Sequence, residues 1–135
     1  MVTLPAGPTA LAAHDWELFA GLFTDDVVLE IAESSSGVGT KTQLLTALRK
    51  RLNSAISVHH GHMPEIEITS ETTATDVWAM FDSVTPPAGS EYPVLTGFGH
   101  HHEECRLKGG QWRISRLEPT RIKRETTPPH EHSRW

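Results

Sequence analysis

The pattern of apolar and polar residues predicts two helices followed by a series of strands. Apolar residues at helical spacing predict a first amphipathic helix from Ala10 to Phe23. A second helix is predicted from Thr40 to about Asn53. Thr40 at the N-cap and Gln43 at the third helical position have the pattern of a capping box. The first part of the chain is therefore predicted to be mostly helical.

Short polar or proline-containing breaks separate the predicted strands. Turns or loops are expected at 24–26, 34–39, 70–73 and 86–90, with a further break at Pro64. Strands are expected between them, at 27–33, 56–60, 65–69 and 74–84. Asp25 and Asp26 are expected to make turn hydrogen bonds. Helices followed by antiparallel strands predict an α+β fold, with the helices packed on one face of a curved sheet.

The stretch 97–117 is predicted to form a long hairpin whose turn contains Gly109 and Gly110. Side chains alternate between the faces of a strand, so His101, Glu103 and Cys105 share one face. The other face receives His100, His102 and Glu104. At least one histidine therefore faces the core or a pocket, whichever way the hairpin packs.

Composition narrows the class of protein. A chain of 135 residues with 37% hydrophobic residues is expected to form one domain, 1–125, with a disordered polar tail at 126–135. The net charge is −5 and no basic stripe is present, which argues against a nucleic-acid partner. A single cysteine, Cys105, excludes an internal disulfide and favours a cytoplasmic location. Residues 1–13 contain no Lys or Arg and suit neither a signal peptide nor a membrane span.

Four stretches together resemble the nuclear transport factor 2-like superfamily, and within it the SnoaL-like and scytalone dehydratase-like group. They are Asp15–Val27, Gly39–Lys41, His59–Ile66 and Gly109–Ile114, and the resemblance covers roughly residues 14–122. It implies a cone-shaped α+β barrel with a pocket between helices and sheet. It also implies a homo-oligomer, either a dimer or a trimer.

The resemblance also implies roles for individual residues. In dehydratase-like relatives a histidine at the start of the third block acts as general base, and its counterpart here is His59. Those relatives carry an aspartate in the first helix, where this chain has Ala12. Asp82 and His101 occupy positions that carry polar pocket residues in relatives. Either another group orients His59, or the dehydratase-type mechanism does not operate.

The residues themselves support these candidates but leave other interpretations open. A histidine has an unperturbed pKa near 6.5, which suits proton transfer near neutrality. A base also needs a partner that orients its ring, and Asp82 or Glu103 could serve. The alternative is a core histidine satisfied by a hydrogen bond. Trp78, Met80 and Leu29 are expected to contact the ligand as an apolar wall.

Two histidine clusters have partial metal-ligand spacing. His60 and His62 with Glu67 resemble a cupin-like set, and His100 and His102 with Glu104 form a second possible set. Pro64 interrupts the first set, and both have the pattern of histidines on a solvated strand. We therefore expect no metal and no cofactor.

The favoured function is a cofactor-independent dehydratase-, isomerase- or cyclase-type proton transfer on a small hydrophobic substrate. His59 would be the base, with His101 and Asp82 as polar partners. The main alternative is a non-catalytic domain that binds a small hydrophobic ligand. A protein-interaction scaffold without a pocket is the third possibility. No nucleic-acid or membrane partner is expected.

Overall fold

The computed structural model describes residues 10, 12–30 and 38–128. Within these residues, two helices and six strands have defined bounds, and both helices precede the four long strands. The elements are α2 (Trp16–Ala20), β1 (Phe23–Glu30), β2 (Val38–Gly39), α3 (Lys41–Leu52), β3 (Ile56–Ile68), β4 (Thr73–Thr85), β5 (Val94–Lys108) and β6 (Gln111–Thr127).

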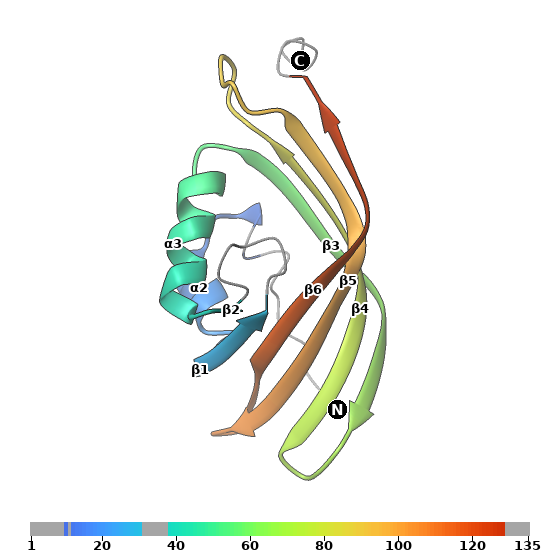
Figure 1. Ribbon diagram of the computed structural model, residues 1–135. Helices are drawn as coiled ribbons and strands as arrows, with labels where there is room; N and C mark the ends of the chain where they lie inside the picture. The colour runs from blue at the N-terminus through green and yellow to red at the C-terminus, as the bar shows by residue number, and fades with distance from the viewer. Residues whose placement is uncertain (1–9, 11, 31–37, 129–135) are drawn as a thin grey trace.

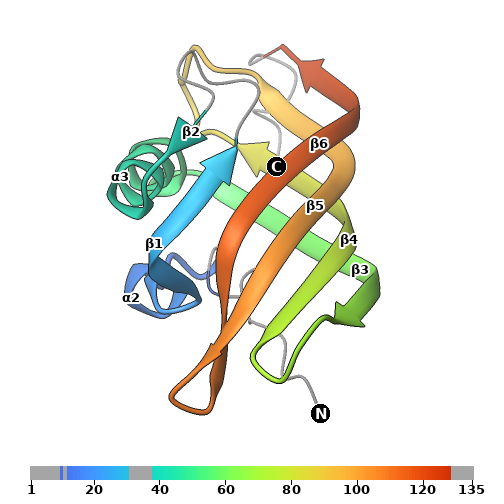
Figure 2. The same ribbon diagram turned by 60° about the horizontal axis from the view of Figure 1, so that its bottom comes forward.

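The strands form one curved sheet in the order β2-β1-β6-β5-β4-β3. All neighbours are antiparallel except β1 and β6, which run parallel. Figure 1 shows α2 and α3 on the concave side of this sheet, and Figure 2 shows β1 lying between α3 and β6. The predicted α+β fold with helices on one face is confirmed.

The apolar core lies between the helices and the concave face. One cluster packs α2 and β1 against the β5–β6 hairpin and contains Phe19, Phe23, Leu29 and Ile114. A second, smaller cluster is centred on Leu52 at the end of α3. The two clusters pack the helices against the sheet. Phe19, Phe23 and Ile114 of the first cluster also border the candidate site.

The capping box of the second helix is confirmed. The Thr40 side chain accepts a hydrogen bond from the Gln43 backbone N–H at 3.2 Å, and the Gln43 side chain accepts one from the Thr40 N–H at 2.9 Å. Among the described residues, no helix has the length and apolar composition required to cross a membrane.

The first helix is much shorter than predicted. Only Trp16–Ala20 form α2, preceded by helical backbone at residues 10 and 12. The helix stops at Gly21, and the carbonyl of Leu22 then accepts a hydrogen bond from the backbone N–H of Ile114 at 2.8 Å. This hydrogen bond places Phe23 in the sheet. Tertiary contacts therefore override the helix that the spacing of the apolar residues predicted.

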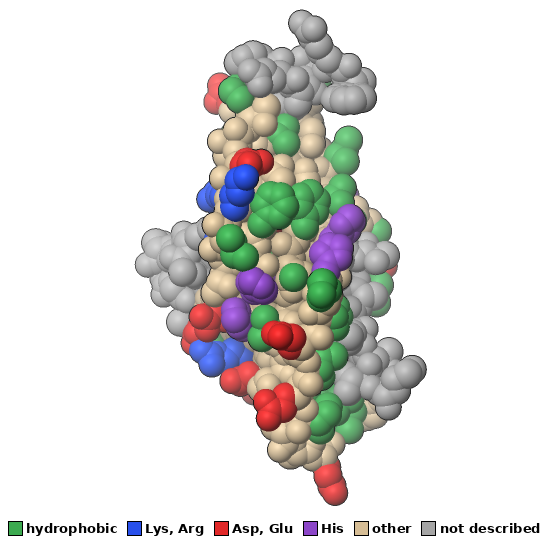
Figure 3. Space-filling view, turned by 90° about the vertical axis from the view of Figure 1, so that its right-hand side faces the viewer, with side chains coloured by type: hydrophobic (Ala, Val, Ile, Leu, Met, Phe, Trp, Pro, Cys, Tyr) green, Lys and Arg blue, Asp and Glu red, His purple; other side chains and the backbone are tan. Residues whose placement is uncertain are grey.

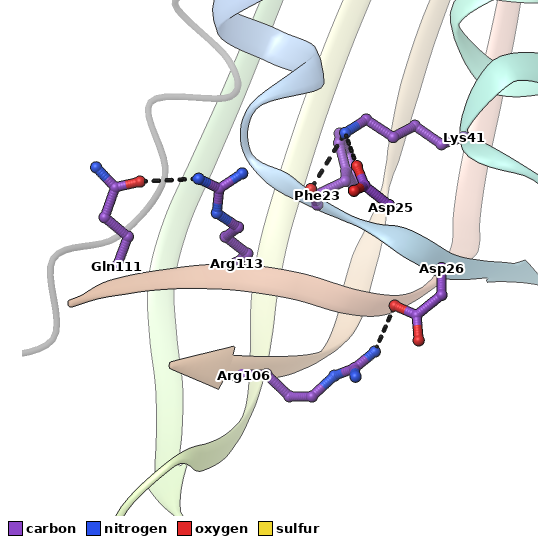
Figure 4. A network of polar contacts seen from close by, with 7 residues as sticks. All are labelled: Phe23, Asp25, Asp26, Lys41, Arg106, Gln111 and Arg113. Atoms are coloured by element: carbon purple, nitrogen blue, oxygen red, sulfur yellow. Dashed lines mark hydrogen bonds and ion pairs between the residues drawn. The ribbon is translucent and has the colours of Figure 1, made fainter. Parts of the chain in front are cut away.

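The predicted turn at 24–26 is wrong, because these residues belong to β1. Their carboxylates pair with cations from other elements, as Figure 4 shows. Lys41 lies 3.5 Å from Asp25 and also donates to the Phe23 carbonyl, and Arg106 lies 2.7 Å from Asp26. Cross-element ion pairs thus replace the expected turn hydrogen bonds.

Pro64 does not end a strand as predicted. β3 continues through it, with a register shift between His62 and Glu65 and a positive φ of 46° at Met63. Since β3 is an edge strand, a proline without an N–H is tolerated at such a bulge. Part of the predicted loop at 34–39 is also strand, because Val38 and Gly39 form β2; residues 31–37 lie outside the described residues.

The long hairpin is confirmed, with its turn at Gly109 and Gly110, both at positive φ. β6 extends beyond the predicted hairpin stretch 97–117 and ends at Thr127, because Thr126 and Thr127 pair with the start of β5. The predicted tail boundary therefore falls inside a strand. The rest of the predicted tail, 129–135, lies outside the described residues.

Candidate functional site

A cavity of about 140 Å³ lies between α2, the start of β1 and the concave face of the sheet. An engineered apolar cavity of similar size, about 150 Å³, holds a benzene ring. The lining combines an apolar wall with several titratable groups. The lining residues are Phe19, Leu22, Phe23, His59, His60, Gly61, Trp78, Met80, Phe81, Asp82, His101, Glu103, Ile114 and Leu117.

His59 comes from β3 and lines this cavity. Its ring nitrogen Nε2 is buried and has no hydrogen-bond partner among the described residues. Burial lowers the pKa of His59, while the nearby Asp82 carboxylate partly opposes this shift. The imidazole is therefore neutral at pH 7 and holds a buried nitrogen without a partner.

Asp82 lies opposite His59 in the β3–β4 register. Its Oδ1 accepts a hydrogen bond from Nη1 of Arg121 on β6 at 3.0 Å, and both side chains are partly shielded from solvent. Asp82 is thus held in place by an ion pair while its charge also acts on His59. Arg121 was not predicted from the sequence, because its position on the concave face depends on a register shift near it in β6.

His101 lines the same cavity from β5. Burial lowers its pKa to about 4; Asp82 opposes the shift, and Arg121, His59 and His102 add to it. At neutral pH the ring is therefore uncharged and can donate one N–H hydrogen bond. The structure brings all three candidate catalytic residues, His59, His101 and Asp82, to one cavity.

Glu103 lines the cavity two residues further along β5. It lies opposite Asp76 in the β4–β5 register, on the same face of the sheet. Burial and the Asp76 charge raise the pKa of Glu103 to about 9, and burial also raises the pKa of Asp76. Glu103 was predicted only as a possible partner for His59, and Asp76 was not identified from the sequence.

Cys105 completes this group. Its thiol donates a hydrogen bond to Asp76 Oδ2 at 3.5 Å, and the candidate ligand atoms of Asp76, Glu103 and Cys105 lie within 4.8 Å of one another. Burial, together with the two carboxyl groups, raises the pKa of the Cys105 thiol. The buried thiol is therefore protonated at neutral pH.

The apolar wall differs in part from the predicted one. Trp78 and Met80 of β4 line the cavity. Leu29 does not belong to the lining; it is 0% exposed and packs in the core cluster that also contains Phe23 and Val27. Phe19 of α2 belongs to both the core and the lining.

Among the described residues, His60 and His62 of β3 and His100 and His102 of β5 alternate with His59 and His101 and lie toward the convex face, and His60 also borders the cavity. Figure 3 shows histidine side chains among hydrophobic ones on that face. The rings of His60 and His62 are 5.5 Å apart, and those of His100 and His102 are 6.3 Å apart. Among the described residues, neither pair gains a third ligand atom close enough for a convergent three-ligand group. Alternation on β5 thus separates the faces as predicted.

Comparison with protein families gives a match over most of the chain. Residues 7–118 match the model described as the SnoaL-like domain. This range includes α2, the cavity and most of the sheet.

Solved structures give the same fold at low sequence identity. A protein provisionally assigned as a scytalone dehydratase from Novosphingobium aromaticivorans DSM 12444 is 19% identical, with a TM-score of 0.76 over 89% of this chain and 79% of that one. A hexachlorocyclohexane dehydrochlorinase, LinA-type3 from Novosphingobium barchaimii LL02, is 13% identical, with a TM-score of 0.72 over 89% and 82%. A conserved protein from Planctomyces limnophilus DSM 3776 is 24% identical, with a TM-score of 0.69 over 84% and 88%. These similarities establish the fold.

Proposed function

The chain belongs to the SnoaL-like domain family, and from this premise we propose that it is a cofactor-independent enzyme that moves a proton on a small hydrophobic carbonyl compound. The observation that carries the proposal is the buried, unpartnered Nε2 of His59 at the wall of the cavity. A buried nitrogen without a partner costs free energy unless a ligand supplies one. A substrate C–H or O–H beside this nitrogen would find a neutral base there.

In the proposed reaction His59 removes a proton from the carbon next to the carbonyl group. Burial lowers its pKa below that of an ordinary histidine, so the ring is mostly unprotonated at pH 7 and can act as a base. The electrons of the broken C–H bond move toward the carbonyl oxygen and form an enolate. Return of the proton to another carbon gives an isomer, and loss of a group from the β-carbon gives an unsaturated product.

His101 and Asp82 are the proposed polar partners. The neutral ring of His101 has one N–H that can stabilise the negative charge developing on the oxygen. Asp82, held by Arg121, acts on His59 through its charge and would stabilise the imidazolium formed after proton transfer. This arrangement can replace the first-helix carboxylate, since Ala12 is exposed and has no carboxyl group.

The cavity also limits the substrate. Its volume of about 140 Å³ and its walls of Trp78, Met80, Phe19 and Leu117 suit one ring or a compound of similar size. The titratable groups of the lining come from β3, β4 and β5, whereas α2 and β1 contribute only the apolar side chains of Phe19 and Phe23. We therefore propose a monocyclic, mostly apolar compound with its oxygen atoms directed toward the sheet.

Proton abstraction can be tested without the natural substrate by using cyclohexanone in deuterated water. The wild-type protein should speed exchange of the hydrogens next to the carbonyl, followed by nuclear magnetic resonance. His59→Gln should lower this rate by about 10² to 10⁴, because glutamine keeps a polar side chain but lacks a basic nitrogen. The matched control is His62→Gln, whose exposed side chain lies outside the lining.

Two results would contradict the proposal. One is wild-type exchange no faster than buffer at saturating ketone. The other is His59→Gln exchange equal to that of wild type.

A non-catalytic ligand-binding domain is the second candidate. The absence of a carboxylate at Ala12 and the ion pair that occupies Asp82 both favour it, since each weakens the orientation of His59. In that case wild-type protein and His59→Gln would bind cyclohexanone with similar affinity and neither would catalyse exchange. Calorimetric titration of both proteins distinguishes the two functions.

A further inference from the structure

We propose that Asp76 and Glu103 share one buried proton at the floor of the cavity, and that Glu103 donates it to the leaving hydroxyl group of a β-hydroxy carbonyl substrate. Here the floor means the end of the cavity formed by Glu103. The inference rests on the proposed function, because it supplies the acid that matches the base His59. It specifies that the reaction is a dehydration, and therefore that the substrate carries a hydroxyl group on the β-carbon.

The geometry of the strands brings the two carboxyl groups together. Asp76 and Glu103 are register partners on β4 and β5 and lie on the concave face. Side chains of directly opposed residues have Cβ atoms about 4.5–5.5 Å apart. The carboxyl atoms of this pair lie within 4.8 Å of each other, and Glu103 alone of the two reaches the cavity wall.

The surroundings offer few other partners for the pair. Asp76 is 4% exposed, and its Oδ1 has no conventional hydrogen-bond donor among the described residues. Its Oδ2 accepts the weak thiol donor of Cys105 at 3.5 Å, and the Trp78 side chain also donates to this carboxyl group. Two like charges at this distance away from water cannot both persist, so one carboxyl group keeps a proton and donates it to the other. That proton accounts for the missing donor to Oδ1.

Titratable groups near Glu103 come from four elements. Asp76 lies on β4, Cys105 and His101 on β5, and His59 reaches the same cavity from β3. β6 contributes Leu117, the register partner of Glu103, and its neighbours Arg116 and Glu118 line a second pocket together with Glu103 and Asp76. Asp76 is therefore the nearest group whose charge keeps the proton on Glu103, and it acts as a positioning residue that does not touch the substrate.

His59 as base and Glu103 as acid account for every proton and electron pair that moves in the elimination. His59 takes the proton next to the carbonyl, and the electrons of that C–H bond form the new C=C bond. The C–O bond at the β-carbon breaks, and its electron pair stays on the oxygen. That oxygen takes the proton from Glu103 and leaves as water. His59 is left protonated and Glu103 ionised, and transfer of one proton from His59 to Glu103 restores both groups.

The shared proton can be tested without a substrate. Infrared spectroscopy of wild-type protein at pH 7 should show the carbonyl band of a protonated carboxylic acid, and Glu103→Gln should lose it. Asp76→Asn should make this band disappear at a lower pH than in wild type, because the charge that holds the proton is gone. Glu104→Gln is the matched control, since Glu104 lies on the other face beside Arg116 and should keep the wild-type band.

Proton donation by Glu103 can be tested by comparing two substrates with different leaving groups. 3-Hydroxycyclohexanone requires a proton on its leaving oxygen, whereas 3-chlorocyclohexanone loses chloride without one. After correction for spontaneous elimination, Glu103→Gln should lower the ratio of hydroxyl to chloride turnover by about 10² to 10⁴. His59→Gln should lower both rates together. Asp76→Asn should shift the alkaline limb of the hydroxyl reaction to lower pH, an effect that a loss of packing alone would not produce.

Three results would overturn the proposal. The first is an absent acid band in wild-type protein at pH 7. The second is a stoichiometric metal ion retained by tag-free protein in place of that band, because Asp76, Glu103 and Cys105 would then bind a cation. The third is an unchanged hydroxyl-to-chloride ratio in Glu103→Gln. Failure of the base, by contrast, would appear as absent exchange with cyclohexanone while the acid band persists.

Discussion

The hydrogen bond from Arg121 Nη1 to Asp82 Oδ1 occupies the space where a side chain at position 97 would lie. A Cβ atom built on Gly97 would lie 2.0 Å from that nitrogen and 2.3 Å from that oxygen. Gly97 on β5 separates the strands that carry the two residues. The absence of a side chain at one position therefore permits an ion pair between β4 and β6 at the end of the candidate site.

This relationship predicts different costs at two neighbouring glycines. Gly97→Ala should break the ion pair and destabilise the fold by about 1 kcal/mol, because the clashing groups are side-chain ends that can move. Gly99→Ala should cost about 2 kcal/mol or more, because its Cβ would lie 1.9 Å from the Thr120 backbone oxygen. Urea unfolding measures both.

Gly21→Ala is the control for these substitutions. Its φ of −67° suits any residue, and a Cβ there would lie 3.4 Å from its nearest neighbour. If Gly97→Ala and Gly99→Ala lowered the free energy of unfolding equally, side-chain ends near Gly97 would be no easier to displace than the backbone near Gly99. This result would contradict the prediction.

Removal of the capping box should destabilise the protein measurably. Thr40→Ala eliminates the acceptor for the Gln43 N–H and should lower the free energy of unfolding by about 1 kcal/mol. Thr42→Ala, on the exposed surface of the same helix, should have a much smaller effect. If the two variants unfold at the same urea concentration, the cap does not stabilise α3.

His101 should make the fold sensitive to mild acid. It takes up a proton near pH 6.5 in the unfolded chain but only near pH 4 in the folded one, because burial disfavours the charged ring. The unfolded state therefore binds more protons in this window, and stability is lost as the pH falls from about 6.5 to about 4. The loss from this residue should reach at most about 3 kcal/mol.

Urea unfolding of wild-type protein and His101→Gln at pH 7.5, 5.5 and 4.5 tests this dependence. The difference in unfolding free energy between the two proteins should change in favour of the variant as the pH falls. A difference that is constant with pH would mean that the folded state accepts the proton on His101 as easily as the unfolded chain.

Cys105 should resist alkylation in the folded protein. Burial and the neighbouring carboxyl groups raise its pKa, so thiolate is scarce at pH 8. Iodoacetamide should label the native protein at least about 100-fold more slowly than the protein unfolded in guanidinium. Asp76→Asn should increase the native rate, since one carboxyl group that opposes the thiolate is gone. Rapid labelling of native wild-type protein would contradict the buried, protonated thiol.

The sequence was most informative where a local rule determines the structure. Alternation along β5 correctly assigned His101, Glu103 and Cys105 to one face, because side-chain direction in a strand has a fixed period. The capping box and the Gly109-Gly110 turn were predicted for the same reason: each depends on a few adjacent residues. Trp78 and Met80 could be placed in the wall by the same alternation, whereas His59 and Asp82 were proposed from the family resemblance.

The sequence was least informative where the structure depends on contacts between strands. The pairing of Asp76 with Glu103 follows from the β4–β5 register, which no local pattern specifies. Arg121 reaches Asp82 only because the register of β5 and β6 shifts near Gly99. The helical spacing of Phe19 and Phe23 was misleading, since the parallel pairing with β6 extends Phe23 into a strand.

That parallel pairing also determines when the protein can fold during its synthesis. Leu29 of β1 pairs with Leu117 of β6, near the opposite end of the chain, so β1 leaves the ribosome long before its partner exists. Contacts so distant in sequence form slowly, and apolar segments that wait for them are exposed to aggregation. Phe19 and Phe23 therefore lack part of their cover until β6 has been synthesised, and the wall that they form is the last part of the site to assemble.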